Sequence, residues 1–199
     1  FPLYVMIVVS FKSNEQFLAN PWFFDSISSW NWHNWAIGWD TVSGYICNSI
    51  FVSFLGTGIT LCIVLMCSYA LARYDFPGKN VIFYLVMATM FLPGTVAALV
   101  TLFDLLRSMG LVNNLWALVL MASVGGQVAG VFILRNFIED IPKELFESAQ
   151  LGGAGHLQQI RHIILPLSAS IISVTCIMDF LSSWNNTILP LLLLRDDEL

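Results

Sequence analysis

The chain has 199 residues, of which 57% are hydrophobic and 11% charged, and its mean hydropathy is +0.77. Soluble domains average about 45–50% apolar and about 25% charged residues, so this composition excludes a soluble globular domain and indicates a membrane protein. The net charge of −5 argues against nucleic acid as a partner.

Four apolar runs are long enough to cross a hydrocarbon core of about 30 Å, which takes about 20 helical residues. In chain order they cover residues 41–72, 80–103, 108–134 and 162–194, and only Asp179 interrupts the last of them. A shorter apolar run over residues 1–11 lacks the basic region and cleavage site of a signal peptide, so we interpret it as the end of a further helix. We therefore expect an all-α, polytopic transmembrane helix bundle that forms one membrane domain over residues 1–199.

The positions of the basic residues predict which side of the membrane each end faces, because Lys and Arg near helix ends are retained in the cytoplasm. If the charged segment 135–165 is cytoplasmic, five of the eight basic residues lie inside: Arg73, Lys79, Arg135, Lys143 and Arg161. Lys12, Arg107 and Arg195 then lie outside. This count leaves residues 195–199 outside after an odd number of crossings, so we expect five of about six helices here and a sixth in the intact protein.

An external loop is predicted over residues 12–44. It contains five of the seven tryptophans, namely Trp22, Trp30, Trp32, Trp35 and Trp39. Tryptophan is enriched at membrane interfaces, where its ring is partly buried and its N–H stays hydrated. The loop therefore suits an interfacial aromatic belt, and the simpler interpretation is an exposed loop without a binding role.

The segment 135–165 contains helix signals on both sides of a glycine pair. Asp140 is predicted to cap a helix that Pro142 opens, and the helix then covers residues 143–151. Gly152 and Gly153 are expected to end it, because glycine accepts the left-handed conformation found past helix ends. A second helix is expected over residues 154–164, and Pro166 marks the point where the chain enters the membrane.

One spaced motif lies within this segment: Glu147-Ser148-Ala149, then Gly153, then Ile163-x-Leu165-Pro166. The motif resembles the cytoplasmic EAA loop of the permease subunits of bacterial ABC importers, E-A-A-x(3)-G-x(9)-I-x-L-P. Ser148 replaces the first alanine, and Gly152 stands where aspartate is common. The alternative is a loop whose glycines only turn the chain.

The resemblance implies that the loop docks a separate ATPase. Glu147 would supply charge to the interface. Small residues would allow a close approach through a groove: Ser148, Ala149, Gly153 and Ala154.

Other parts of the chain are similar to carbohydrate importer permeases of the maltose type. The turn Tyr69-Ala70-Leu71-Ala72-Arg73 with Phe76-Pro77-Gly78-Lys79 is one such part. Pro93, the segments 110–116 and 141–145, and Ser183-Trp184-Asn185 with 189–192 are the others. The resemblance implies a type I ABC importer permease fold in a bacterial cytoplasmic membrane. It also implies the partners: ABC ATPase subunits, a second permease subunit, an extracytoplasmic solute-binding protein and a sugar.

The chain contains no G-x-x-x-x-G-K-[ST] phosphate loop, so we predict no catalytic residues, and ATP hydrolysis by a partner. No cofactor or metal is predicted, because His33, His156 and His162 lack companions at metal-ligand spacing. Two other functions stay open: import of another small solute such as an amino acid or osmolyte, and secondary transport.

Polar side chains in the last apolar run are candidates for the substrate pathway, because such groups generally face the interior of a bundle. They are Asp179, Trp184, Asn185 and Asn186. Amides and carboxylates can bond sugar hydroxyls, and an indole can stack on a pyranose face. The alternative is that Asn185 and Asn186 bond between helices or to backbone freed around a local break.

Overall fold

The computed structural model describes residues 1–92, 96–125 and 127–194, and within these ranges helix is the only regular secondary structure. This confirms the predicted all-α class. The chain divides into two compact units, Phe1–Asn48 and Ser49–Leu199, which we describe separately.

The first unit contains α1 (Pro2–Ser10), α2 (Asn14–Ala19), the short 3-10 helix η1 (Ile27–Ser29) and the beginning of α3 (His33–Arg73). The segment expected as an external loop is therefore partly helical. Lys12 is buried and its Nζ lies 2.5 Å from Asp25 Oδ2. Phe11 stacks on Trp30 with 4.6 Å between ring centroids, so aromatic packing and the ion pair of Lys12 with the partly exposed Asp25 hold this unit together.

Helix α3 contains the whole predicted run 41–72, and it is long and apolar enough to cross a membrane as one continuous helix. Most of its buried residues in the second unit have another three or four positions away and form one face: Val52, Ser53, Gly56, Thr57, Thr60, Val64 and Ser68. Small residues on such a face let helices approach closely. An ideal Cβ on Gly56 would lie 2.6 Å from Ala122 Cβ, so only glycine fits at this crossing without a shift.

The three later apolar runs each divide into shorter helices, which the length of the runs did not indicate. The run 80–103 divides into α4 (Lys79–Ala88), η2 (Thr89–Phe91) and α5 (Val96–Ser108); Pro93 lies outside the described residues. The run 108–134 divides into α6 (Leu115–Gly125) and α7 (Gln127–Asp140).

The run 162–194 bends by 84° between residues 156–167 and helix α11 (Ala169–Trp184), and then continues as α12 (Ile188–Leu193). By length and composition, the described residues provide one continuous candidate span, or up to three if each bent pair forms one span. Arg195, which we expected outside the membrane, lies outside the described residues.

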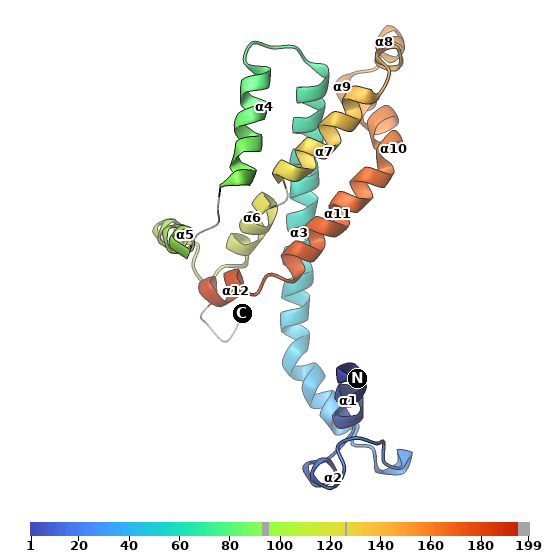
Figure 1. The fold of residues 1–199 in the computed structure, drawn as a ribbon, viewed down its shortest axis with the longest axis vertical. Helices are drawn as coiled ribbons and strands as arrows, with labels where there is room; N and C mark the ends of the chain where they lie inside the picture. Colours follow the sequence, from blue (N-terminus) through green and yellow to red (C-terminus); the bar gives the residue numbers. More distant parts are fainter. Residues whose placement is uncertain (93–95, 126, 195–199) are drawn as a thin grey trace. The chain divides into compact units, whose positions relative to one another are not determined.

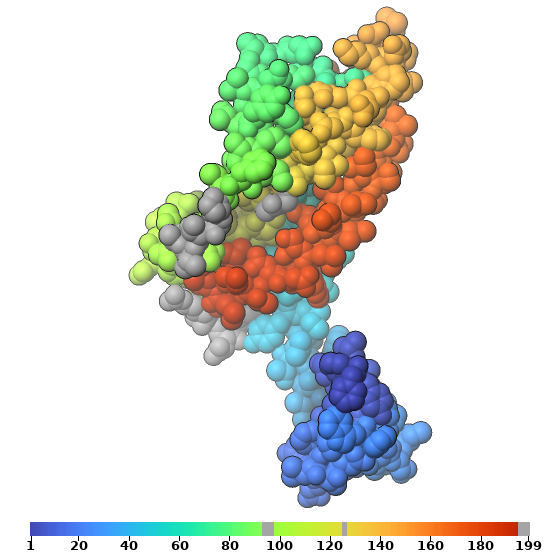
Figure 2. All heavy atoms as spheres, viewed as in Figure 1, coloured from blue at the N-terminus to red at the C-terminus, as the bar shows by residue number. Residues whose placement is uncertain are grey.

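Two hydrophobic clusters hold the second unit together. One combines α3, α4, α7 and the segment 141–164 through residues such as Val64, Phe83 and Ile138. The other combines α3, α5, α6 and α12 through residues such as Val119 and Leu193. Helix α7 contacts both α4 and α11, and the three lie beside one another on the face seen in Figures 1 and 2.

Candidate functional site

The segment between α7 and α11 begins with α8 (Lys143–Leu151), which has the bounds predicted from the sequence. Gly153 follows it with φ +83°, the left-handed conformation that glycine adopts without strain. The Gly153 N–H donates to Gln150 O and the Ala154 N–H donates to Ala149 O, both at 2.9 Å. This pair of bonds is a Schellman motif, which satisfies the last carbonyls of the helix and turns the chain sharply.

The start of α8 differs from the prediction. Asp140 is the last residue of α7, and Pro142 occupies the N-cap of α8 without a side-chain hydrogen bond. The expected Asp140 cap is therefore wrong. Ile141 and Pro142 separate the two helices, and the N–H of Leu145 bonds the Pro142 carbonyl instead at 3.3 Å.

The chain beyond the turn is helical but changes its type. Helix α9 (His156–Gln159) continues into η3 (Ile160–Ile164), a π-helix, and then α10 (Leu165–Leu167). Pro166 has no N–H and its ring crowds the carbonyl of residue i−4, so a wider helical turn before it relieves both problems. The predicted helix 154–164 is thus present from residue 156, with a π-helical turn that the spacing of Ile163, Leu165 and Pro166 did not indicate.

The motif residues do not share one face. Glu147, Ser148 and Gly153 are exposed, and Ala149 and Ala154 are half-buried. Ser148 Oγ donates to Leu145 O at 3.0 Å. Ile163 packs against the larger hydrophobic cluster, where its neighbour Ile164 is fully buried, whereas Leu165 and Pro166 are exposed.

A polar cavity of about 470 Å³ lies on the Glu147 side of α8. Four residues of α8 line it at helical spacing, namely Lys143, Phe146, Glu147 and Gln150. The end of α3, the residues just after it and α9 supply most of the rest of the lining, including Tyr69, Arg73, Tyr74, His156 and Gln159. The small residues Ser148, Ala149, Gly153 and Ala154 do not line this cavity, so the groove expected from their size is not this one.

The end of α3 bonds directly to the loop. Tyr69 Oη donates to Gln159 Oε1 at 3.0 Å and lies 3.1 Å from His156 Nδ1. Tyr74 Oη lies 2.7 Å from the same nitrogen, and the Arg73 guanidinium lies 3.4 Å from the centroid of the Phe146 ring. We had expected no site role for His156, and its partners are too far along the chain for spacing to reveal them.

Asp179 is buried on α11. Its Oδ2 has no hydrogen-bond partner among the residues described. Asp179 also lines a largely apolar cavity of about 490 Å³ between α7 and α11, with Thr175 and Ser182. As expected for a polar group in an apolar run, Asp179 faces protein.

The other pathway candidates lie at the break between α11 and α12. Trp184 is half-exposed and stacks on Phe180 with 5.8 Å between ring centroids. Asn185 Nδ2 donates to Leu181 O at 2.9 Å, and Asn186 Oδ1 accepts from the Leu189 N–H at 3.2 Å. Both asparagines thus bond backbone groups around a helix break, the geometry that the alternative above expects. No cluster of three or more potential metal ligands occurs among the residues that the structure describes.

The described part of the chain is a bundle of apolar helices with a short, glycine-terminated helix between two bent helix pairs, each a candidate membrane span. The family model described as "Binding-protein-dependent transport system inner membrane component" matches residues 64–198, more than half of the chain. The chain belongs to this family, and it is therefore a transport permease component.

The chain is similar to the two relatives and the solved structure that follow. The diacetylchitobiose uptake system permease protein NgcG of Streptomyces coelicolor is 30% identical over 199 residues, which are 99% of this chain and 65% of that protein. The maltodextrin transport system permease protein MalD of Streptococcus pneumoniae is 26% identical over 202 residues, 100% of this chain and 70% of that protein. This chain thus spans about two thirds of the length of these relatives.

The solved structure is the crystal structure of a bacterial ABC transporter involved in the import of the acidic polysaccharide alginate. The two chains have a TM-score of 0.83 at 20% identity, over 100% of this chain and 69% of that chain. The similarity confirms the predicted importer permease fold.

Proposed function

We propose that this chain is the membrane-spanning subunit of an ATP-driven importer and that segment 135–165 couples it to a separate ATPase. The observation that carries the proposal is the geometry of α8. The Schellman motif at Gly153 fixes the end of a helix whose outer side, with Leu145 and Ser148, is exposed and free for a partner. Glu147 forms no ion pair among the described residues, so its charge is free for a partner.

Two permease subunits would form the pathway, and a solute-binding protein would deliver the solute to it from outside. ATPase subunits that bind one state of the bundle better than the other would drive rigid-body rocking between the two states. The proposal implies a multi-pass protein of a bacterial cytoplasmic membrane, with segment 135–165 inside and residues 12–44 outside.

A carbohydrate is the proposed solute. The names of NgcG and MalD support it, because they refer to diacetylchitobiose and maltodextrin. The sequence turn at Tyr69–Arg73 supports the same class. The other candidates are import of another small solute and secondary transport, and uptake into membrane vesicles without ATP would favour the secondary transporter.

The site experiment isolates the transporter complex through a tag on this chain, after the native cysteines have been replaced. Single cysteines at Leu145 and Ser148, on the exposed side of α8, should cross-link to a co-purifying ATPase through a short bifunctional reagent. A cysteine at Val81, which is 62% exposed on α4, is the matched control and should not. An ATPase that co-purifies but cross-links only through Val81 would contradict the docking role.

Orientation is tested with single cysteines that a membrane-impermeant maleimide can reach. Cysteines at Asn80 and Gly155 should react from the cytoplasmic side and a cysteine at Asn31 from the outside. Asn80 is preferable to the neighbouring Gly78, whose φ of +87° would strain any other residue. Reaction of all three from one side would overturn the orientation and the docking argument with it.

A further inference from the structure

The C-terminal end of α3 meets the loop α8–α9 through contacts between residues 68 to 90 positions apart in the sequence. The family resemblance explains the loop as a docking element but gives no role to the Tyr-Ala-Leu-Ala-Arg turn at the end of α3. The structure brings both ends of that turn, Tyr69 and Arg73, against the loop.

Arg73 makes the contact to α8. Its guanidinium carbon lies 3.4 Å from the centroid of the Phe146 ring, and its Nη2 donates to Ile141 O at 3.5 Å. A planar guanidinium stacks on an aromatic face in a way that a lysine ammonium does not. Phe146 is buried, so the contact lies in the hydrophobic cluster and holds α8 and the connection between α7 and α8 to α3.

Gln159 makes the contact to the turn after α8. It is almost completely buried, and its Oε1 accepts from the Tyr69 hydroxyl at 3.0 Å. Its Nε2 donates to the Ala154 carbonyl at 3.1 Å. One amide therefore links α3 to the glycine turn, and both of its polar ends are used.

His156 makes the third contact, between two tyrosine hydroxyls. The Tyr69 O–H donates to Gln159, and the Tyr69 oxygen lies 3.1 Å from His156 Nδ1. The Tyr74 oxygen lies 2.7 Å from the same Nδ1 and 3.1 Å from Nε2. Both tyrosine hydroxyls thus contact the imidazole, which ties α9 to the residues on both sides of Arg73.

We infer that Tyr69, Arg73 and Tyr74 form a joint that fixes the coupling loop to α3, so that α3 moves with α8 as one body. The inference rests on the proposed function of the loop. Tyr69, Tyr74 and His156 are positioning residues: they act through the loop, without contact with solute or nucleotide. These residues contact α8, the glycine turn and α9, so we expect each of the three parts to move together with α3.

The joint is tested by the distance between two spin labels in the purified transporter complex. Met66 on α3 is 65% exposed and Leu151 at the end of α8 is 91% exposed, so cysteines at both sites accept labels without disturbing the joint. The complex is measured without nucleotide and after trapping with ATP and vanadate. We expect one narrow distance distribution that is the same in both states. A distance that changes between the states would overturn the inference.

Variants then remove the joint. Tyr74→Phe and His156→Phe should each broaden the distribution of the distance between the two labels. The fraction of molecules in which α8 has moved away from α3 should rise about fivefold, because the loss of one hydrogen bond changes an equilibrium by about that factor. The double variant should do no more than the stronger single variant, because both remove one shared contact. Additive effects, or no broadening, would overturn the joint. If the His156 variants do not assemble, Arg73→Lys, which keeps the charge and loses the stack, is measured instead.

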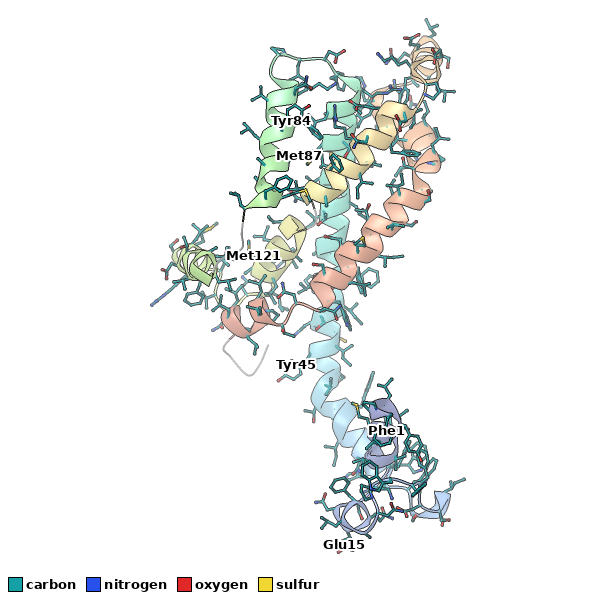
Figure 3. All side chains as sticks on the ribbon, in the orientation of Figure 1. Phe1, Glu15, Tyr45, Tyr84, Met87 and Met121 are labelled. Atoms are coloured by element: carbon teal, nitrogen blue, oxygen red, sulfur yellow. The ribbon has the colours of Figure 1, made fainter. Side chains whose placement is uncertain are left out.

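Two controls separate this inference from the proposed function. Tyr84→Phe on α4 removes an exposed hydroxyl (Tyr84 is labelled in Figure 3) and should leave the distribution unchanged. The cross-link from Leu145 to the ATPase should persist in the Tyr74 and His156 variants, because docking does not need the joint. If the cross-link is absent even when the joint residues are unchanged, the docking role alone is contradicted. The distance between the labels then still tests whether the joint exists.

Discussion

Two substitutions at Gly153 distinguish the effect of backbone strain in the turn from the effect of blocking a partner. Gly153 has φ +83°, and an ideal Cβ built on it meets no atom within 4 Å. Gly153→Ala therefore adds backbone strain and no clash within the chain. Left-handed backbone costs a residue with a Cβ roughly 1–2 kcal/mol. At 1.4 kcal/mol per factor of ten, the turn should open about 5 to 30 times more often. Gly153→Asn should be milder, because asparagine tolerates this conformation.

Gly153→Trp carries the same strain as Gly153→Ala and adds a large ring in the open space. If a partner approaches there, the tryptophan variant should lose the co-purified ATPase and its ATP hydrolysis, whereas the alanine variant should be only weakened. The assay compares both quantities per permease in complexes isolated from membranes, with membrane insertion of each variant as the control. Equal ATPase retention and hydrolysis in the alanine and tryptophan variants would refute the close approach at Gly153.

Three further predictions follow from packing and charge. Gly56→Ala places a Cβ 2.6 Å from a methyl carbon of α6 and should destabilise the purified protein by about 1–3 kcal/mol. Gly58→Ala is the control and should not, because a Cβ there meets nothing within 4 Å. Equal melting temperatures of the two variants would contradict this. Asp25→Asn should speed proteolysis of residues 1–48 more than Lys12→Met does. The first variant leaves the ammonium of Lys12, which is 2% exposed, without its partner, whereas the second leaves only the 36% exposed carboxylate of Asp25. The reverse order of proteolysis rates would contradict this. Asp179→Asn should change uptake affinity or solute preference if Asp179 lines the pathway; reduced complex yield with unchanged preference would assign it to helix packing.

Local signals in the sequence predicted the elements whose causes are local. The bounds of α8 follow from Pro142 and the glycine pair, and the apolar run 41–72 is long enough to identify α3 by composition alone. The Asp140 cap failed because α7 continues through that residue, so its backbone is helical and unsuited to an N-cap. Apolar length also could not show where a run bends, since the breaks depend on individual residues such as Pro166 and Ser168.

Contacts between distant segments were beyond sequence reasoning. Tyr69 and Arg73 were identified only as part of a turn similar to the family's, and His156 only as a histidine without metal-ligand companions. Their meeting depends on how α3, α7 and α9 cross, which the hydrophobic clusters determine and no spacing in one chain encodes. The motif residues Glu147, Ser148 and Ala149 could be singled out from local spacing alone, and the structure leaves the first two exposed and the third half-buried. Their role in docking stays a prediction.

If the segment 156–167 moves when a partner binds, the 84° bend at Ser168 determines how that movement reaches α11. Two helices in line would transmit a push along their common axis as a piston does. Helices that meet near a right angle cannot, because a push along the first acts across the second. A displacement along α9 and α10 would therefore act across α11 and tilt it, and Asp179 would move sideways relative to the axis of α11.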